Sequence, residues 1–366
     1  MKNVALIHDF LLYHGGAEST LSAMSEVFSE APIFTLLKKA DFVEDNFKGK
    51  KIHESFLQKA PKFFLKRYHF LFPLMPTAIE TFNLRDFDVV VSSSSAFAKG
   101  VVVKPKTKHF CYMHAPMRYV WDWNHEYLEE QKMKGRSKFF TRLFLNYLRM
   151  WDRASAERVD YFIANSKYTA TRIKKYYRKD SQVIYPPVDV EKFTPQREHL
   201  DYFLTVGRLS PYKRTKLIVE TFVKLKLPLI VVGDGKEYDE LQKLAKDNKN
   251  IKILGWVDEK KLIKLYENSK AFICASEDDF NITAVEAMAA GKPVVALRRG
   301  GTAETILENK TGVFFDVPQL EVVADGIRRF IEHDVEFDYI EISEYAKNFS
   351  KENFQKTLKN FINKNS

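Results

Sequence analysis

The sequence predicts an α/β fold with two doubly wound domains that face each other across a cleft. Short, continuous apolar runs alternate with helical patterns along almost the whole chain of 366 residues. Such runs, separated by helices, indicate parallel sheets covered on both faces. A Tyr-Pro-Pro segment near the middle of the chain precedes a second strand–helix series. The alternation therefore predicts the fold class, and the interruption predicts two copies of it.

Each predicted strand is a short run rich in Val, Ile, Phe or Leu. In the first half these runs are 4–8, 88–93, 101–103, 161–165 and a strand that ends in His114; in the second half they are 203–207, 229–233, 251–254, 271–276, 293–297 and 312–315. Tyr185-Pro186-Pro187 suits neither a helix interior nor a central strand, so we place the boundary there. We expect one domain over 1–186, a second over 190–348, and a terminal helix over 349–366 that packs back on the first.

Composition narrows the class of protein. No run approaches the roughly 20 apolar residues of a membrane-spanning helix, and the start MKNVALIHDF predicts a first strand rather than a signal peptide. Cys111 and Cys274 are the only cysteines, which favours two free thiols in a reducing cytoplasm. We therefore expect a cytoplasmic protein.

The formal net charge of +10 suggests an anionic partner. The stretches 56–79 and 133–151 contain four and five Lys or Arg, no acid, and many Phe, Leu and Tyr. This mixture favours peripheral binding to an anionic membrane, although a buried helix with one basic side gives the same pattern. Nucleic acid is not expected, because zinc-finger spacing, an RNA-binding aromatic signature and a basic tail are all missing from the sequence.

Two motifs that follow predicted strands suit phosphate. In HDFLLYHGGAEST, Gly15 and Gly16 precede a helix that we expect near Ala17, where free N–H groups and close backbone approach favour a phosphate or sugar oxygen. A plain turn would use glycine too. In VGRLSPYKR, Arg208 and Lys213 flank a turn before a helix, and two cations there suit a diphosphate. Surface charge is the alternative, but cations are unfavourable at a helix start.

The stretch CASEDDFNITAVEAMAAGKPVVA, residues 274–296, predicts a sugar-nucleotide site. Acids before a helix suit sugar hydroxyls, and they also cap helices. Capping does not explain Glu286, which stands alone in a helix of small apolar residues and suits a ribose diol. The predicted donor-binding residues here are Asp278, Phe280, Asn281, Ile282, Thr283 and Glu286.

A histidine and two rejected motifs complete the survey. His114, at a strand end before Pro116, is either a ligand for a sugar or acceptor or a structural residue. GDGKEY lacks the third glycine of a dinucleotide loop, and Asp86-Phe87-Asp88 is interpreted as a turn rather than a metal site. We therefore expect neither a metal nor a cofactor.

In their order along the chain, these motifs resemble the family 4 retaining glycosyltransferases, which have two Rossmann-like domains in the GT-B arrangement. The resemblance rests on HDFLLYHGGAE, YMHAPMRYVWD, IANSKYTATRI, VIYPPVD, VGRLSPYKR, GDG, LGWV and DDFNITAVEAMAAGKPVVA. The forms HxPMRYxWD and VGRLxPYKR are similar to bacterial mannosyltransferases of O-antigen and capsule synthesis. The resemblance implies transfer of a hexose, usually mannose from GDP-mannose, to a lipid-linked or polysaccharide acceptor at the inner face of the cytoplasmic membrane.

The resemblance also implies residue roles. Arg208 and Lys213 would hold the diphosphate, Glu286 the ribose and Asp278 the donor sugar, while Gly16 would lie against the phosphate and His114 beside the sugar. His114, Asp278, Arg208 and Lys213 are thus the implied catalytic residues, and no metal is implied.

The chain departs from the family pattern at three positions. The family commonly has glutamate, glycine and often proline where this chain has Asp278, Asn281 and Ala284. These departures leave open a transferase that uses a UDP-hexose and a non-catalytic sugar-nucleotide-binding partner in a polysaccharide assembly complex.

Overall fold

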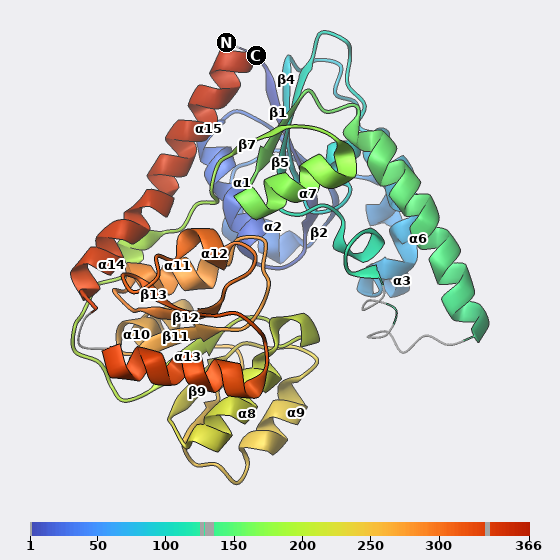
Figure 1. The fold of residues 1–366 in the computed structure, drawn as a ribbon. Coiled ribbons are helices and arrows are strands. Elements are labelled where there is room, and N and C mark those ends of the chain that lie inside the picture. The colour runs from blue at the N-terminus through green and yellow to red at the C-terminus, as the bar shows by residue number, and fades with distance from the viewer. Residues whose placement is uncertain (1, 125–127, 129–134, 334–336) are drawn as a thin grey trace. The chain divides into compact units, whose positions relative to one another are not determined.

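The computed structural model describes residues 2–124, 128, 135–333 and 337–366. The chain divides into two compact units, which are Met1–Pro187 with Phe354–Ser366 (unit 1) and Val188–Asn353 (unit 2). Each unit is an α/β domain with its own parallel sheet, so the predicted fold class is confirmed (Figure 1).

Unit 1 is built on a seven-stranded parallel sheet of order β3-β2-β1-β4-β5-β6-β7. Its strands are β1 Val4–Leu11, β2 Ile33–Lys38, β3 Ile52–Glu54, β4 Val89–Ser94, β5 Lys108–Met113, β6 Tyr161–Ala164 and β7 Ser181–Val183. Its helices are α1 Gly16–Val27, α2 Ala40–Asn46, α3 Lys62–Lys66, α4 Met75–Glu80, α6 Gly135–Ala156, α7 Lys167–Tyr177 and, from Phe354 on, α15 Lys351–Asn365. The order outward from β1 in both directions is that of a doubly wound sheet.

Unit 2 has a six-stranded parallel sheet of order β10-β9-β8-β11-β12-β13. Its strands are β8 Phe203–Val206, β9 Leu229–Val232, β10 Ile251–Ile253, β11 Ala271–Cys274, β12 Val294–Leu297 and β13 Gly312–Phe315. Its helices are α8 Thr215–Leu225, α9 Tyr238–Ala245, α10 Glu259–Glu267, α11 Ile282–Ala289, α12 Thr302–Thr305, α13 Leu320–His333 and α14 Tyr339–Ala346. Every predicted strand of the second half is present in this sheet.

The core of unit 1 covers both faces of its sheet. On one face, α3, α4 and α6 contribute to a cluster that includes Leu145 and Leu148. On the other face, the terminal helix α15 inserts Phe354, Leu358 and Ile362, which are spaced by four residues as one helix face requires. Because both faces of the sheet are covered, its strands are apolar throughout. A strand that alternated apolar and polar residues would bury polar side chains without hydrogen-bond partners.

One predicted strand is wrong. Residues 101–103 follow the 3-10 turn η3 Ala98–Gly100 and have no partner strand in the described sheet. The position beside β4 is taken by β5, so the β-branched run 101–103 has no ladder to join. Three strands escaped prediction: β3 and β7 have only three residues each, and β2 carries Thr35 inside its apolar run.

Candidate donor site and the strand ends of unit 1

The candidate donor site of unit 2 lies where β8 and β11 end. The segment η6 Pro211–Lys213 follows β8 and brings Lys213 toward the loop after β11. Lys213 Nζ contacts both carboxylate oxygens of Asp278, at 2.9 and 2.8 Å. These two residues, with Asn281 and Thr283, line one small pocket. Because parallel strands end at one edge of a sheet, residues 65 positions apart meet there.

The carboxylate of Asp278 is held from a second side. Ser276 Oγ donates to Asp278 Oδ2 over 2.6 Å, and the aspartate is 7% exposed. Burial opposes protonation of Lys213, but the Asp278 carboxylate outweighs it, so the pKa of Lys213 is raised and the ammonium group stays charged. The site therefore presents a fixed cation beside a fixed anion, which suits a ligand that carries both phosphate and hydroxyl groups.

Helix α11 begins with an unusual backbone conformation. Asn281 has φ 72° and ψ 73°, in the left-handed region that favours glycine and tolerates asparagine. Its side-chain Oδ1 accepts a 2.7 Å hydrogen bond from Thr283 Oγ1. Asparagine thus makes here a turn of the kind that glycine makes most readily. Ile282 is the first residue of α11, as predicted, and Phe280 is buried against Phe349.

Glu286 lies one turn into α11 and has a dedicated partner. Tyr266 Oη, from α10, donates to Glu286 Oε2 over 2.8 Å. Burial raises the pKa of Glu286, while the Tyr266 hydrogen bond and Lys192 oppose the shift. Tyr266 fixes one carboxylate oxygen, so the other is the one available to a ligand.

The structure does not bring Arg208 into this cluster. Its side chain is exposed, and within the described residues its guanidinium has no hydrogen bond or ion pair. Arg214, which the sequence did not single out, is instead tied to the site: its Nη1 donates to Ala275 O over 3.0 Å from a left-handed backbone with φ 54°. Ser276 and Tyr266 were also missed, because neither residue type signals a ligand by itself.

The GDG segment has a packing role. Gly233 has φ 138°, and a Cβ placed there would lie 1.8 Å from Gly207 O. A Cβ at Gly235 would lie 2.2 Å from Leu209 O. The segment therefore supports the loop that carries Arg208, which explains its glycines without a dinucleotide.

In unit 1, the predicted site residues lie at the strand ends of the sheet. Gly16 is the first residue of α1, and Gly15 precedes it in an extended conformation with φ −165°. His114 directly follows β5, and its Nε2 lies 2.8 Å from Ser93 Oγ at the end of β4. Asn165 Nδ2 donates to the carbonyl oxygen of His114 over 2.9 Å. Gly15 and His114 thus lie beyond the carboxyl ends of β1 and β5, the two strands that flank β4 in the sheet.

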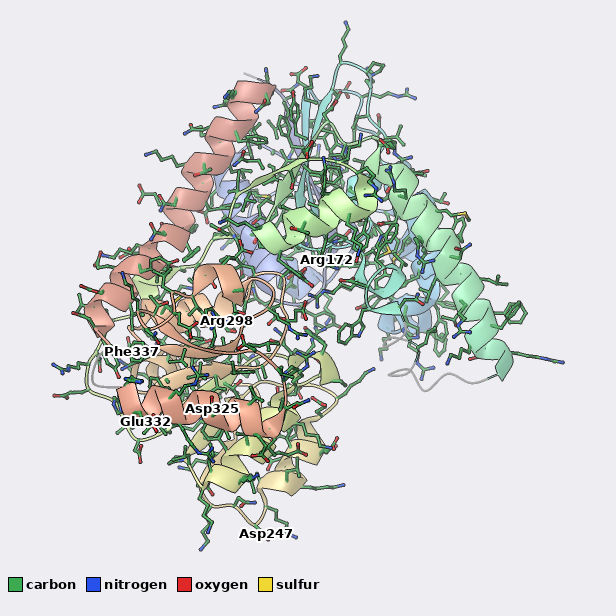
Figure 2. The ribbon with its side chains drawn as sticks, in the orientation of Figure 1. Arg172, Asp247, Arg298, Asp325, Glu332 and Phe337 are labelled. Carbon is green, nitrogen blue, oxygen red and sulfur yellow. The ribbon has the colours of Figure 1, made fainter. Side chains whose placement is uncertain are left out.

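The loop after His114 is pinned by Arg172 of α7 (Figure 2). Arg172 Nη2 donates to Asp122 Oδ1 over 2.7 Å and to Pro116 O over 3.4 Å. Both acceptors belong to the YMHAPMRYVWDW segment, so the ion pair fixes the path of the chain away from His114.

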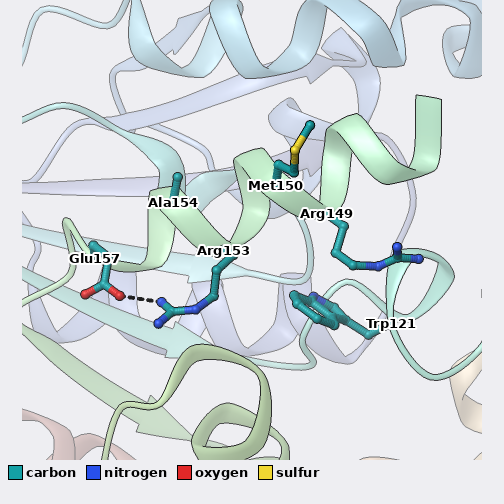
Figure 3. Close-up of a pocket in the computed structure, with 6 residues that line it drawn as sticks. All are labelled: Trp121, Arg149, Met150, Arg153, Ala154 and Glu157. Carbon is teal, nitrogen blue, oxygen red and sulfur yellow. Dashed lines mark hydrogen bonds and ion pairs between the residues drawn. The ribbon is translucent and has the colours of Figure 1, made fainter. Parts of the chain in front are cut away.

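A shallow pocket along α6 is lined by Trp121, Arg149, Met150, Arg153, Ala154 and Glu157 (Figure 3). Arg153 pairs with Glu157, and Arg149 Nε donates to Val120 O over 2.6 Å. Its cations are therefore already engaged, and we assign no ligand to it. In the described part of the chain, no three His, Cys, Asp or Glu side chains gather as metal ligands would.

Comparison with known proteins agrees with this geometry. Residues 189–355 match the family described as Glycosyl transferases group 1, and residues 32–192 match Glycosyltransferase Family 4. The two matched regions adjoin near the predicted connector and together span most of the chain. The chain is therefore a family 4 glycosyltransferase of the GT-B type.

Relatives and solved structures support the same class. An uncharacterized glycosyltransferase of Methanocaldococcus jannaschii is 27% identical over 312 residues, which cover 76% of each chain. The human alpha-1,3/1,6-mannosyltransferase ALG2 is 24% identical over 284 residues, covering 67% of this chain and 65% of that protein. HepE of Anabaena, solved with UDP-glucose, has a TM-score of 0.73 at 17% identity, with 100% of both chains covered. At that identity the likeness concerns the fold.

Proposed function

We propose that this chain is a retaining mannosyltransferase that moves mannose from GDP-mannose to a lipid-linked or polysaccharide acceptor in cell-surface glycan synthesis. The observation that carries the proposal is the Lys213–Asp278 pair at the strand ends of unit 2, with Glu286 on the following helix. The three residues match the three parts of a sugar nucleotide: Lys213 suits the diphosphate, Asp278 the hydroxyl groups of the sugar, and Glu286 the ribose.

In the proposed reaction, the bond between the anomeric carbon and the diphosphate oxygen breaks, and its electron pair stays on that oxygen. The acceptor hydroxyl oxygen forms the new bond to the anomeric carbon. The diphosphate oxygen carries negative charge as its bond breaks, and it then takes the proton that the hydroxyl loses. Lys213 stabilises that charge from a fixed position, which is the largest single contribution available to such a site. Arg208, whose exposed side chain is not held by the cluster, is proposed as the second cation. These cations take the role that a metal fills in other transferases.

Mannose is supported by two observations, and guanosine follows from the resemblance, because such mannosyltransferases usually use GDP-mannose. The segments HAPMRYVWD and VGRLSPYKR resemble those of bacterial mannosyltransferases. The alpha-1,3/1,6-mannosyltransferases ALG2 of Homo sapiens and Dictyostelium discoideum are among the relatives, at 24% and 22% identity.

A donor panel tests the proposed reaction. The protein is incubated with labelled GDP-mannose, GDP-fucose, UDP-glucose or UDP-galactose and a bacterial lipid extract, with and without EDTA. We expect label from GDP-mannose to enter the organic phase, at a rate that EDTA leaves unchanged. Label that moves only from a uridine donor would overturn the donor assignment, and transfer from none would favour the non-catalytic alternative.

We further propose that unit 1 carries the membrane contact and holds the protein at the inner face of the cytoplasmic membrane. The inner sides of 56–79 and α6 pack into one core, through residues such as Leu57 and Leu145. Their outer sides expose large apolar residues: Phe56, Phe63, Phe64, Phe70 and Leu74 in the first stretch, and Phe139, Phe140, Leu143, Tyr147 and Met150 in α6.

Cations accompany these exposed residues. Lys59, Lys62, Lys66 and Arg67 stand in the first stretch, and Arg136, Lys138, Arg142 and Arg149 in the part of α6 before Asp152; neither 56–79 nor 133–151 contains an acid. Part of the predicted second stretch, residues 133–134, lies outside the described residues. Over the described ranges, none of the helices is long and apolar enough to cross a bilayer. Apolar side chains beside cations suit anionic headgroups.

The membrane contact predicts a measurable loss in vesicle flotation. The triple substitution Phe139→Ala, Phe140→Ala and Leu143→Ala should lower binding to anionic vesicles roughly 10-fold or more. The reason is that it removes three large apolar side chains that the proposed contact buries in the membrane. Trp256→Ala is the matched control, since this residue of unit 2 is 79% exposed. Equal flotation of the triple variant and wild type, or no flotation of wild type at low salt, would contradict the proposal.

A further inference from the structure

Four polar side chains form a continuous line at the carboxyl end of the unit 1 sheet. Glu18 Oε1 lies 3.5 Å from His8 Nε2. His8 Nδ1 lies 3.1 Å from Ser93 Oγ, and the same hydroxyl lies 2.8 Å from His114 Nε2. The line thus joins α1, β1, β4 and the residue after β5, and every internal polar atom in it has a neighbour in it.

The middle of this line is closed to water and held by the sheet. His8 is 2% exposed and Ser93 is fully buried. The two residues are direct partners in the parallel register of β1 and β4. The backbone N–H of His114 donates to Ser94 O over 2.9 Å. Because buried polar groups must satisfy one another, each donor in the line is set by the acceptor beside it.

The carboxylate of Glu18, at one end of the line, determines which nitrogen of each histidine carries the proton. An ionised carboxylate only accepts, so His8 Nε2 carries the proton that faces Glu18. When the ring of His8 carries only this proton, its Nδ1 accepts the Ser93 hydroxyl proton. Ser93 Oγ in turn accepts from His114 Nε2–H. This leaves the proton of His114 on Nε2 and a lone pair on Nδ1.

His114 itself stays uncharged. Burial is the main cause that lowers the pKa of His114 to about 3. His114 as a residue is only half-buried, and among the described residues no hydrogen bond reaches its Nδ1. That nitrogen is therefore a neutral acceptor, open at the end of the sheet.

We propose that Glu18, His8 and Ser93 are positioning residues that fix His114 in the Nε2–H tautomer, so that Nδ1 accepts a hydrogen bond from a substrate hydroxyl group. This inference rests on the proposed function for the identity of the hydroxyl as one of a sugar. A hydroxyl can donate where a phosphate cannot, so the tautomer directs His114 to the sugar and away from the diphosphate. Glycine at position 15 leaves room for this arrangement, because a Cβ there would lie 2.9 Å from Glu18 Oε2.

The tautomer is measurable without any substrate. In protein labelled with ¹⁵N-histidine, ring spectra distinguish protonated from bare nitrogens, and His114→Gln assigns the signal of His114 among the nine histidines. We expect bare Nδ1 and protonated Nε2 in the wild type, and mixed tautomers in Ser93→Ala and Glu18→Gln. A proton on Nδ1 in the wild type, or a ring spectrum unchanged in both variants, would overturn the proposal.

Ser92→Ala is the matched control. Ser92 is also fully buried on β4 and bonds a different histidine, His109, at 2.9 Å. We expect it to leave the His114 spectrum and the kcat/KM for the donor unchanged, whereas Ser93→Ala lowers that kcat/KM about 10-fold. If the wild type turns over no donor while the spectra behave as expected, the tautomer assignment is supported and the proposed function falls.

Discussion

Lys213→Ala should lower kcat for glycosyl transfer by about 10²–10³-fold, since a preorganised charge at the leaving group contributes on the order of 3 kcal/mol to transition-state stabilisation. Lys213 is positioned for this role by Asp278, which holds its ammonium group through both carboxylate oxygens. Release of nucleotide diphosphate, followed by a coupled assay at saturating donor, measures the effect.

The control for this substitution is Lys216→Ala. Lys216 follows Lys213 by three residues, belongs to α8 and pairs with Glu240 near the surface. It should leave kcat within about twofold, because surface ion pairs contribute little. A Lys213→Ala enzyme that folds and retains most of its kcat would remove the leaving-group role from this site.

Asp152→Asn should destabilise unit 1 by about 3–5 kcal/mol, the usual cost of leaving a buried charge without its counterion. Asp152 and Lys99 form a fully buried ion pair. The same carboxylate accepts from Trp121 Nε1 at 2.7 Å and from Tyr177 Oη at 2.8 Å. Asparagine offers one acceptor oxygen where three donors converge, and its amide group faces the Lys99 ammonium.

Urea unfolding followed by tryptophan fluorescence tests this prediction. In a Trp256→Phe background the remaining tryptophans, Trp121, Trp123 and Trp151, all belong to unit 1. Asp180→Asn is the control, because Asp180 pairs with Lys174 while its side chain is 90% exposed. A midpoint for Asp152→Asn that matches the control would show that the pair carries little of the stability of the unit.

Several features of the donor site were predictable because they depend on local sequence. Lys213, Asp278 and Glu286 each follow a recognisable apolar strand, and parallel strands end at one edge of the sheet. Their pairing was not predictable, since Lys213 and Asp278 are separated by 65 residues and a carboxylate can accept from many donors. Tyr266, which orients Glu286, reaches the site from another helix and leaves no signal in the sequence around α11.

The fold shows the same division between local and long-range causes. The strands of unit 2 were predicted because each is a β-branched run between helices. Residues 101–103 have the same composition but no vacant sheet position, and the exposed fraction of Val102 is 48%. A high β-propensity therefore does not produce a strand when another strand already occupies the neighbouring position in the sheet. The line from Glu18 to His114 escaped prediction for a related reason, since it depends on the register of β1 against β4.

The central claim is that the site around Lys213, Asp278 and Glu286 holds a guanosine diphosphate sugar. Calorimetric titration of the purified protein with GDP, GDP-mannose, UDP and UDP-glucose tests it most directly. The account predicts that both guanosine ligands bind at least about 10-fold more tightly than their uridine counterparts, a difference of about 1.4 kcal/mol. Preference for the uridine ligands, or binding of none of the four, would contradict it.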